Sequence, residues 1–262
     1  MSNMSILLFM AIIPVMLILL FVYYKDRNKE PMILLLELFV LGIISCGLTL
    51  LSFDLLGRIL PFMKLKSESF IDVLLYTFLG VALIEETSKW IMLYIFGYRS
   101  KHFDEKYDGL IYAVFVSLGF AFIENIMYIL TKVDITTAVV RAFSAVPSHA
   151  CDAVFMGYYL SIAKAYSIKE NKKEVRKNLF LSLIVPILLH GIYDFCLMMN
   201  NSIFLAVFFI FVVFMYFISI KRLNELSLSK EKILEVRHRF CKYCGQSINH
   251  AKICPNCGKP QI

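Results

Sequence analysis

The sequence LLYTFLGVALIEETSKWIML (residues 74–93) places three ionisable side chains inside a long apolar run. Glu85, Glu86 and Lys89 lie within five residues of one another. A charged side chain at the centre of a bilayer costs at least about 2.5 kcal/mol, so such residues usually face a bundle interior or a wet cavity. The stretch therefore predicts a membrane helix that carries part of a functional site.

The rest of the chain has the composition of a membrane protein. Of its 262 residues, 59% are hydrophobic and 18% are charged. A helix needs about 20 apolar residues to cross a hydrocarbon core about 30 Å thick. Runs of that length predict an all-α, polytopic membrane helix bundle of about seven spans. The sequence shows no internal repeat of the kind that many transporters have. The predicted spans are residues 4–23, 31–53, 70–97, 108–130, 137–163, 178–199 and 203–220.

Lysine and arginine residues in the loops predict the orientation. They gather after the first, third and fifth spans and after residue 220, whereas the loop after the fourth span has only Lys132 and the loop after the sixth has none. Because basic loops stay in the cytoplasm, we expect the N-terminus outside and the C-terminus inside. The loop that contains Arg58, Lys64 and Lys66 disagrees with this orientation. The first span is expected to be an anchor rather than a cleavable signal peptide, because its basic residues follow the apolar run.

Ionisable residues of four predicted spans lie at nearly one depth. At about 1.5 Å per residue, Glu85, Glu86 and His149 fall near the middle of their spans, His190 just past it, and Glu124 about 7 Å past it. A glutamate paired with histidine can deprotonate a water, and a second histidine or an asparagine can donate to the developing oxyanion. Two histidines and a glutamate are also a catalytic zinc set, although no HExxH pattern favours a metal. The residues predicted to be catalytic are Glu85, Glu86, Glu124, His149 and His190.

Helical spacing assigns supporting roles to three more residues. At about 100° per residue Lys89 lies between Glu85 and Glu86, so one glutamate is expected to pair with it while the other faces the cavity. Asp194 follows His190 by one helical turn and could orient the imidazole. Asn125 is the third supporting residue, whereas packing explains the polar residues Arg141 and Asp152 adequately.

Four short motifs resemble those of the PrsW family of intramembrane proteases, within the superfamily of CAAX-prenyl-endopeptidase-like membrane proteins. They are EETSK at 85–89, FAFIEN at 120–125, the stretch from Arg141 to PSH at 147–149, and HGIYD at 190–194. The motifs follow the family order, one per helix, and the resemblance covers roughly residues 10–220. Lys89 and Glu124 stand where the wider superfamily often has arginine and histidine, which favours the PrsW branch.

The resemblance implies an activity and a location. It implies cleavage of a membrane-anchored protein, similar to an anti-sigma factor, near or within a bacterial cell membrane. PrsW proteins have been called metalloproteases, whereas the related prenyl endopeptidases resemble glutamate-type hydrolases, so a catalytic divalent metal such as zinc stays open. By the same resemblance Glu85, the first glutamate of the pair, is the one that activates water.

The last 22 residues contain four of the seven cysteines, as two CxxC pairs each followed by glycine. Two such pairs supply the four thiolates that a structural zinc ion needs, and so small a module cannot fold without metal. We expect a cytoplasmic zinc ribbon over residues 241–262, after a charged linker at 221–240 and a protease domain at 1–220. Its partner is expected to be a cytoplasmic protein rather than nucleic acid. The predicted zinc ligands are Cys241, Cys244, Cys254 and Cys257.

Two other classes of function compete with a protease. A channel or transporter could relay ions through midplane glutamate and histidine, with the ribbon as a regulatory metal sensor. That function needs a polar pathway to both faces, but the polar residues cluster at one level. A membrane scaffold that has lost its chemistry is opposed by the intact set of Glu85, Glu86, His149 and His190.

Overall fold

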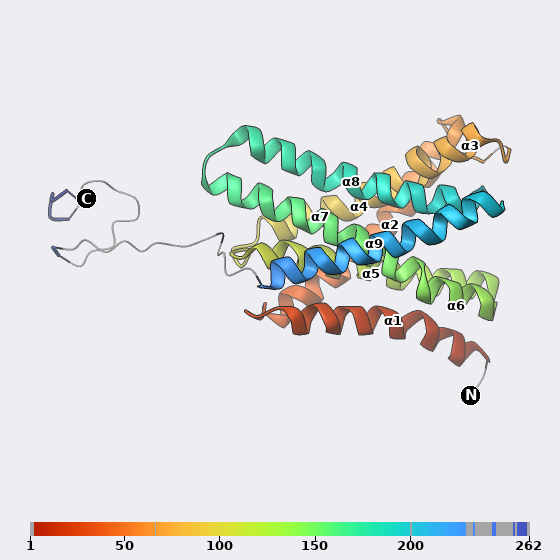
Figure 1. The fold of residues 1–262 in the computed structure, drawn as a ribbon, viewed down its shortest axis with the longest axis horizontal. Helices are drawn as coiled ribbons and strands as arrows, with labels where there is room; N and C mark the ends of the chain where they lie inside the picture. Colours follow the sequence, from red (N-terminus) through yellow and green to blue (C-terminus); the bar gives the residue numbers. More distant parts are fainter. Residues whose placement is uncertain are drawn as a thin grey trace.

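A computed structural model of the chain describes residues 3–65, 67–199, 201–228, 233, 243–244, 254 and 256–260. Within these residues the protein is an all-α membrane helix bundle, as the sequence predicts (Figure 1). The long helices are α1 (Asn3–Lys25), α2 (Met32–Gly57), α5 (Lys106–Lys132), α7 (Ala145–Ile168), α8 (Lys172–Met198) and α9 (Ser202–Leu228). The shorter elements are η1 (Pro61–Met63), α3 (Phe70–Leu75), η2 (Tyr76–Ala82), α4 (Leu83–Met92), η3 (Leu93–Tyr98) and α6 (Ile135–Phe143).

Five of these helices are long and apolar enough to cross a membrane, by length and composition: α1, α2, α5, α8 and α9. The other two predicted spans, the third and the fifth, are helical too. The third is divided among several short elements, and the fifth is divided between α6 and the polar helix α7. These two segments carry Glu85, Glu86 and His149, so the least regular segments of the bundle hold much of the predicted site.

Helix α5 forms the centre of the bundle. It packs against α1, α2 and α7, and 72% of its apolar window is buried, against 22% for α9. Glycine allows the closest approaches between helices. A Cβ atom on Gly157 of α7 would lie 2.3 Å from the carbonyl oxygen of Gly109 of α5, and real Cβ contacts are never that short. The tight α5–α7 contact brings Glu124 and His149 toward each other.

The third span is a continuous helical segment whose hydrogen bonding changes three times between Phe70 and Tyr98. The α-helix α4 lies between two π-helical elements, η2 and η3. Single π-helical turns are rare and occur often at functional sites. Here they flank the ten residues that contain Glu85, Glu86 and Lys89.

The fifth span breaks at Ser144, between α6 and α7. A proline inside a helix is a common cause of a kink, but the break comes three residues before Pro147. Pro147 lies in the first turn of α7, where a backbone N–H has no intrahelical acceptor, so a proline is tolerated there. The break separates Arg141 from His149 and lets both side chains point into one site.

The C-terminal region is described in part. Helix α9 continues past residue 220 to Leu228, and Leu223 and Leu226 pack into the core, so the start of the predicted linker belongs to the last helix. The backbone N–H of Ile233 donates to the carbonyl oxygen of Asp104. The predicted zinc ligand Cys241 lies outside the described residues.

Candidate active site

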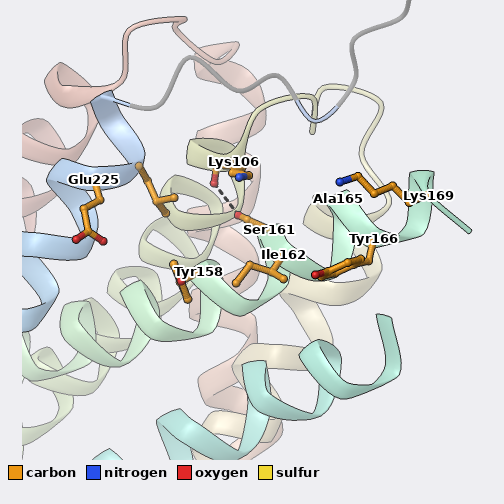
Figure 2. Close-up of a pocket in the computed structure, with 9 residues that line it drawn as sticks. Lys106, Tyr158, Ser161, Ile162, Ala165, Tyr166, Lys169 and Glu225 are labelled. Atoms are coloured by element: carbon orange, nitrogen blue, oxygen red, sulfur yellow. Dashed lines mark hydrogen bonds between the residues drawn. The ribbon is translucent and has the colours of Figure 1, made fainter. Parts of the chain in front are cut away.

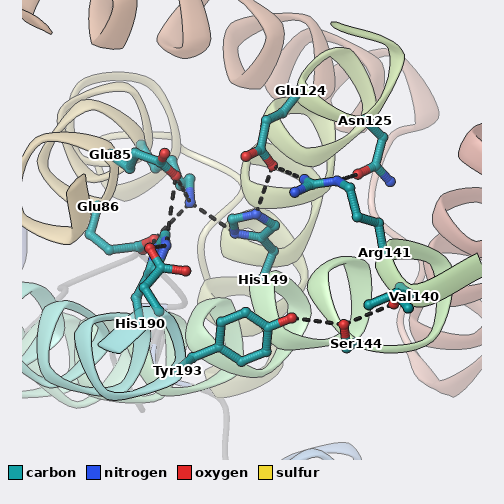
Figure 3. A network of polar contacts seen from close by, with 12 residues as sticks. Glu85, Glu86, Glu124, Asn125, Val140, Arg141, Ser144, His149, His190 and Tyr193 are labelled. Carbon is teal, nitrogen blue, oxygen red and sulfur yellow. Dashed lines mark hydrogen bonds and ion pairs between the residues drawn. The ribbon is translucent and has the colours of Figure 1, made fainter. Parts of the chain in front are cut away.

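Glu85, Glu86, His149 and His190 come together from α4, α7 and α8, and we call them the glutamate–histidine cluster (Figure 3). One ligand atom from each lies within 4.8 Å of the others. All four side chains are buried, which accords with the common depth that the sequence predicts. The helices therefore bring the predicted catalytic residues into one site inside the bundle.

Lys89 pairs mainly with Glu86, and Glu85 faces a cavity. Lys89 Nζ lies 2.7 Å from Glu86 Oε1 but 3.7 Å from Glu85 Oε2. Glu85 lines a cavity of about 70 Å³, and Glu86 is not among the lining residues. One glutamate is thus paired with the lysine and the other faces open space, as helical spacing predicts.

Each histidine is held through both ring nitrogens. His149 Nδ1 lies 3.1 Å from Lys89 Nζ, and its Nε2 lies 3.0 Å from Glu124 Oε2. Because an ammonium can only donate and a carboxylate accepts, His149 accepts at Nδ1 and donates from Nε2–H. His190 Nδ1 lies 2.8 Å from Glu86 Oε1, and its Nε2 lies 3.4 Å from Asp194 Oδ2. Asp194 therefore lies close enough to orient His190, the role that its spacing suggests.

Glu124 and Asn125 of α5 are bound by Arg141 of α6. Arg141 donates from an Nη atom to Glu124 Oε2 at 2.6 Å and from Nε to Asn125 Oδ1 at 2.7 Å. Its guanidinium also lies over the ring of Tyr128. Glu124 therefore shares one oxygen between Arg141 and His149, while Asn125 orients the arginine and does not line the cavity.

Sequence reasoning undervalued three residues that line the same cavity: Arg141, Asp152 and Tyr193. Asp152 is 1% exposed, and its Oδ1 has no hydrogen-bond partner. Tyr193 donates from its hydroxyl to Ser144 Oγ. Arg141 and Tyr193 stand in two of the quoted motifs, and the signal for Asp152 is the spacing His149-x2-Asp152, which places the two side chains on one side of α7.

The site has more carboxylates than cations. Glu85, Glu124, Asp152 and Asp194 line the cavity and Glu86 lies beside it, whereas Lys89 and Arg141 are the cations that contact them. Such an excess of buried negative charge needs protons or a bound cation to balance it. Glu85 Oε2 and Glu86 Oε2 are buried without a hydrogen-bond partner.

The glutamate–histidine cluster therefore fits a divalent metal in donor chemistry, because carboxylate oxygens and imidazole nitrogens are zinc ligands. The fit has one peculiarity: the Lys89 ammonium lies among the same donor atoms.

A second cavity, of about 450 Å³, lies near the start of α5 and the ends of α7 and α9 (Figure 2). The Ser161 hydroxyl proton is shared there between the backbone oxygens of Lys106 and Gly157. Among the described lining residues, Glu225 is the one carboxylate, and no histidine or cysteine accompanies it. The larger cavity thus lacks the groups that the smaller one concentrates.

Three of the four predicted zinc ligands are described and lie together. The Sγ atoms of Cys244, Cys254 and Cys257 lie within 4.8 Å of one another. Gly258 follows the second pair with φ of +67°, a left-handed conformation that glycine adopts without strain. The group could hold a metal ion.

Comparison with known proteins identifies the relatives of this chain. A family model described as PrsW family intramembrane metalloprotease matches residues 30–220. Among curated proteins, Protease PrsW of Clostridioides difficile is 32% identical over 87% of this chain and 94% of its own length. Protease PrsW of Oceanobacillus iheyensis is 36% identical, and that of Bacillus subtilis 35%, each over 82% of this chain and 93% of its own. No solved structure matches.

Proposed function

The chain belongs to the PrsW family of intramembrane proteases, and from this premise we propose that its glutamate–histidine cluster hydrolyses a peptide bond of a membrane-anchored protein. The chain is an integral membrane protein and a protease by its relatives. The observation that carries the mechanism is Glu85, which lines the cavity with a buried oxygen that no hydrogen bond uses. The transporter function that the sequence left open is not favoured by these comparisons.

Glu85 is the general base in this proposal. The cavity of about 70 Å³ has room for water but not for a peptide segment, so the scissile bond reaches it from the cavity mouth. Glu85 takes a proton from the water, and the resulting hydroxide attacks the carbonyl carbon. When the C–N bond breaks, Glu85 returns the proton to the leaving nitrogen, so no proton is left over.

The remaining residues position Glu85 and stabilise the developing charge. Glu86 binds both Lys89 Nζ and His190 Nδ1, which directs His190 Nε2 toward Glu85 and Asp194. Arg141 is a cationic donor that lines the cavity and can face an oxyanion, and the hydroxyl groups of Tyr128, Ser148 and Tyr193 line the cavity as well. Sequence reasoning assigned that role to a histidine or an asparagine, but Asn125 acts through Arg141. A divalent metal bound by the cluster would supply Lewis acidity toward the carbonyl.

The finer assignments extend this proposal. The substrate is a membrane protein similar to an anti-sigma factor, and the N-terminus faces the outside. Cys241, Cys244, Cys254 and Cys257 hold a structural zinc ion in a cytoplasmic ribbon that docks a protein. The proximity of the three described thiols supports the zinc assignment.

Co-expression with candidate substrates tests the proposal. We would express a panel of single-pass membrane proteins tagged on both sides of the membrane with the wild type, Glu85→Gln or Glu37→Gln. Glu37 is an exposed glutamate of α2, so its substitution is the matched control. We expect fragments with the wild type and Glu37→Gln and none with Glu85→Gln, and the tag retained shows the side of cleavage. Equal fragments from all three chains would exclude Glu85 as the base.

A further inference from the structure

Lys89 lies among the atoms of the glutamate–histidine cluster that could bind a metal ion. Its side chain is 1% exposed and crosses the ring face of Phe120, with Nζ 4.2 Å from the ring centre. From there Nζ contacts Glu86 Oε1 at 2.7 Å, His149 Nδ1 at 3.1 Å and Glu85 Oε2 at 3.7 Å. Three of the four residues that could share one metal ion thus already surround an ammonium.

The same atoms would be the metal ligands. His149 donates from Nε2–H to Glu124, so Nδ1 is its only nitrogen with a free lone pair, and that lone pair accepts from Lys89. Glu86 Oε1 is shared between Lys89 and His190. A metal ion could take His149 only after the lysine has left its nitrogen.

Charge repulsion adds to the competition for donor atoms. Glu86 Oε1 lies 2.7 Å from Lys89 Nζ. A zinc ion bound to this oxygen at the usual distance of about 2.1 Å would therefore lie within about 5 Å of the ammonium. Two positive charges at this distance repel each other strongly, even at an effective dielectric constant of about 20. Lysine and metal are therefore alternatives at this site.

We propose that Lys89 is a tethered competitor that lowers the affinity of the glutamate–histidine cluster for divalent metal. Its ammonium holds Glu86 and His149 in place with one positive charge, in the position where a metal ion would do so with two. The proposal concerns the same site as the proposed function, but metal affinity is measured without substrate, so either can fail while the other stands.

Cobalt titration of the purified full-length chain tests the proposal. The four ribbon cysteines are first replaced by serine, which leaves the cluster as the site under test, and Co²⁺ binding is followed by its visible absorption. We expect Lys89→Met, which keeps an unbranched stem without charge, to bind Co²⁺ at least about tenfold more tightly than the chain with Lys89, because the repelling charge is gone. Lys89→Arg, which keeps the charge, should show no gain.

Two further variants locate the effect and guard against misfolding. Adding Glu86→Gln to Lys89→Met should remove the gain in affinity, because it removes a ligand of the cluster. Lys89→Gln repeats the test with a polar side chain if size-exclusion chromatography shows that Lys89→Met does not fold. Equal or weaker Co²⁺ binding without the lysine, or a gain that survives Glu86→Gln, would overturn the proposal.

Discussion

The chain buries two groups of carboxylates, and their surroundings differ. The first is the glutamate–histidine cluster with its neighbours. The second, which we call the loop carboxylate cluster, consists of Asp26, Glu30 and Asp108, all less than 10% exposed. It lies where the loop between α1 and α2 meets the start of α5.

Neutral donors satisfy the loop carboxylate cluster. Asp26 accepts from the backbone N–H groups of residues 28 and 30, and Glu30 accepts from the Tyr112 hydroxyl at 2.7 Å. Asp108 accepts from the N–H groups of residues 104 and 105 and caps α5. In the part of the chain that the structure describes, the buried carboxylate oxygens without a partner belong to Glu85, Glu86 and Asp152 and not to this cluster.

The comparison shows that buried carboxylates differ in whether their oxygens are all hydrogen-bonded. In the loop carboxylate cluster, backbone N–H groups and a tyrosine hydroxyl donate to the carboxylates, and the cluster connects a loop to a helix. Where histidine, lysine and arginine surround carboxylates that keep unused oxygens beside a cavity, the group can accept protons and bind substrate. The predictions below perturb the two clusters together or one at a time.

The largest difference is expected between His190→Ala and Tyr112→Phe. His190→Ala removes the partner of Glu86 and Asp194 that positions Glu85, so the cleavage rate should fall by up to about 10²–10⁴-fold, which is what a general base itself contributes. Tyr112→Phe removes one hydrogen bond to Glu30, so it should cost about 1 kcal/mol of stability and leave the cleavage rate unchanged. Initial rates and thermal melts of the two purified variants measure both effects. A comparable loss of cleavage in Tyr112→Phe would show that the loop carboxylate cluster takes part in catalysis.

A smaller effect is expected from pH. Burial raises the pKa of Glu30 to about 7. Repulsion from Asp26 and Asp104 adds to the shift, and hydrogen bonds with Tyr112 and Asp108 oppose it. A carboxyl group whose pKa is higher in the folded state stabilises the fold below the unfolded pKa, and this stability is lost as pH rises through the folded pKa. The ionisation of Glu30 should therefore lower the melting temperature as the pH rises from about 4.5 to about 7.

Glu30→Gln isolates that contribution. The amide cannot ionise, so the difference in melting temperature between Glu30→Gln and the wild type should grow in favour of the variant as pH rises. Asp26 has a raised pKa as well, also because of burial. It is present in both chains, so it acts on the difference only through its repulsion of ionised Glu30. A difference that stays constant from pH 4 to pH 8 would show that Glu30 is not buried as its contacts indicate.

Much of the fold and the site follows from the sequence, because a membrane restricts both. Apolar runs specify helices, and charged residues inside such runs must face one another, so Glu85, His149 and His190 could be placed together. The role of Lys89 between two glutamates followed from helical angles alone.

The remaining features depend on contacts between helices. Nothing local in the sequence indicates that α4 has π-helical neighbours or that the fifth span breaks at Ser144 rather than near Pro147. The hydrogen bonds from Arg141 to Glu124 and Asn125 could not be predicted, because they depend on how α6 packs against α5. From the sequence, packing is an adequate explanation for the polar residue Asp152. The structure shows that Asp152 lines the cavity and that its Oδ1 has no hydrogen-bond partner.

In the proposed mechanism, Glu85 activates water while Glu86 pairs with Lys89. This difference is tested most directly by measuring both stability and cleavage for a variant of each glutamate. Purified wild type, Glu85→Gln and Glu86→Gln would be reconstituted in lipid vesicles with a cleaved substrate, and single-turnover rates and thermal melts recorded. Glu85→Gln should melt near the wild type and lose cleavage, because Glu85 Oε2 makes no hydrogen bond but faces the cavity. Glu86→Gln should lose cleavage and also about 3–5 kcal/mol of stability, because it leaves a buried lysine without its carboxylate. Wild-type cleavage by Glu85→Gln, or a stability loss in Glu85→Gln rather than Glu86→Gln, would contradict this account.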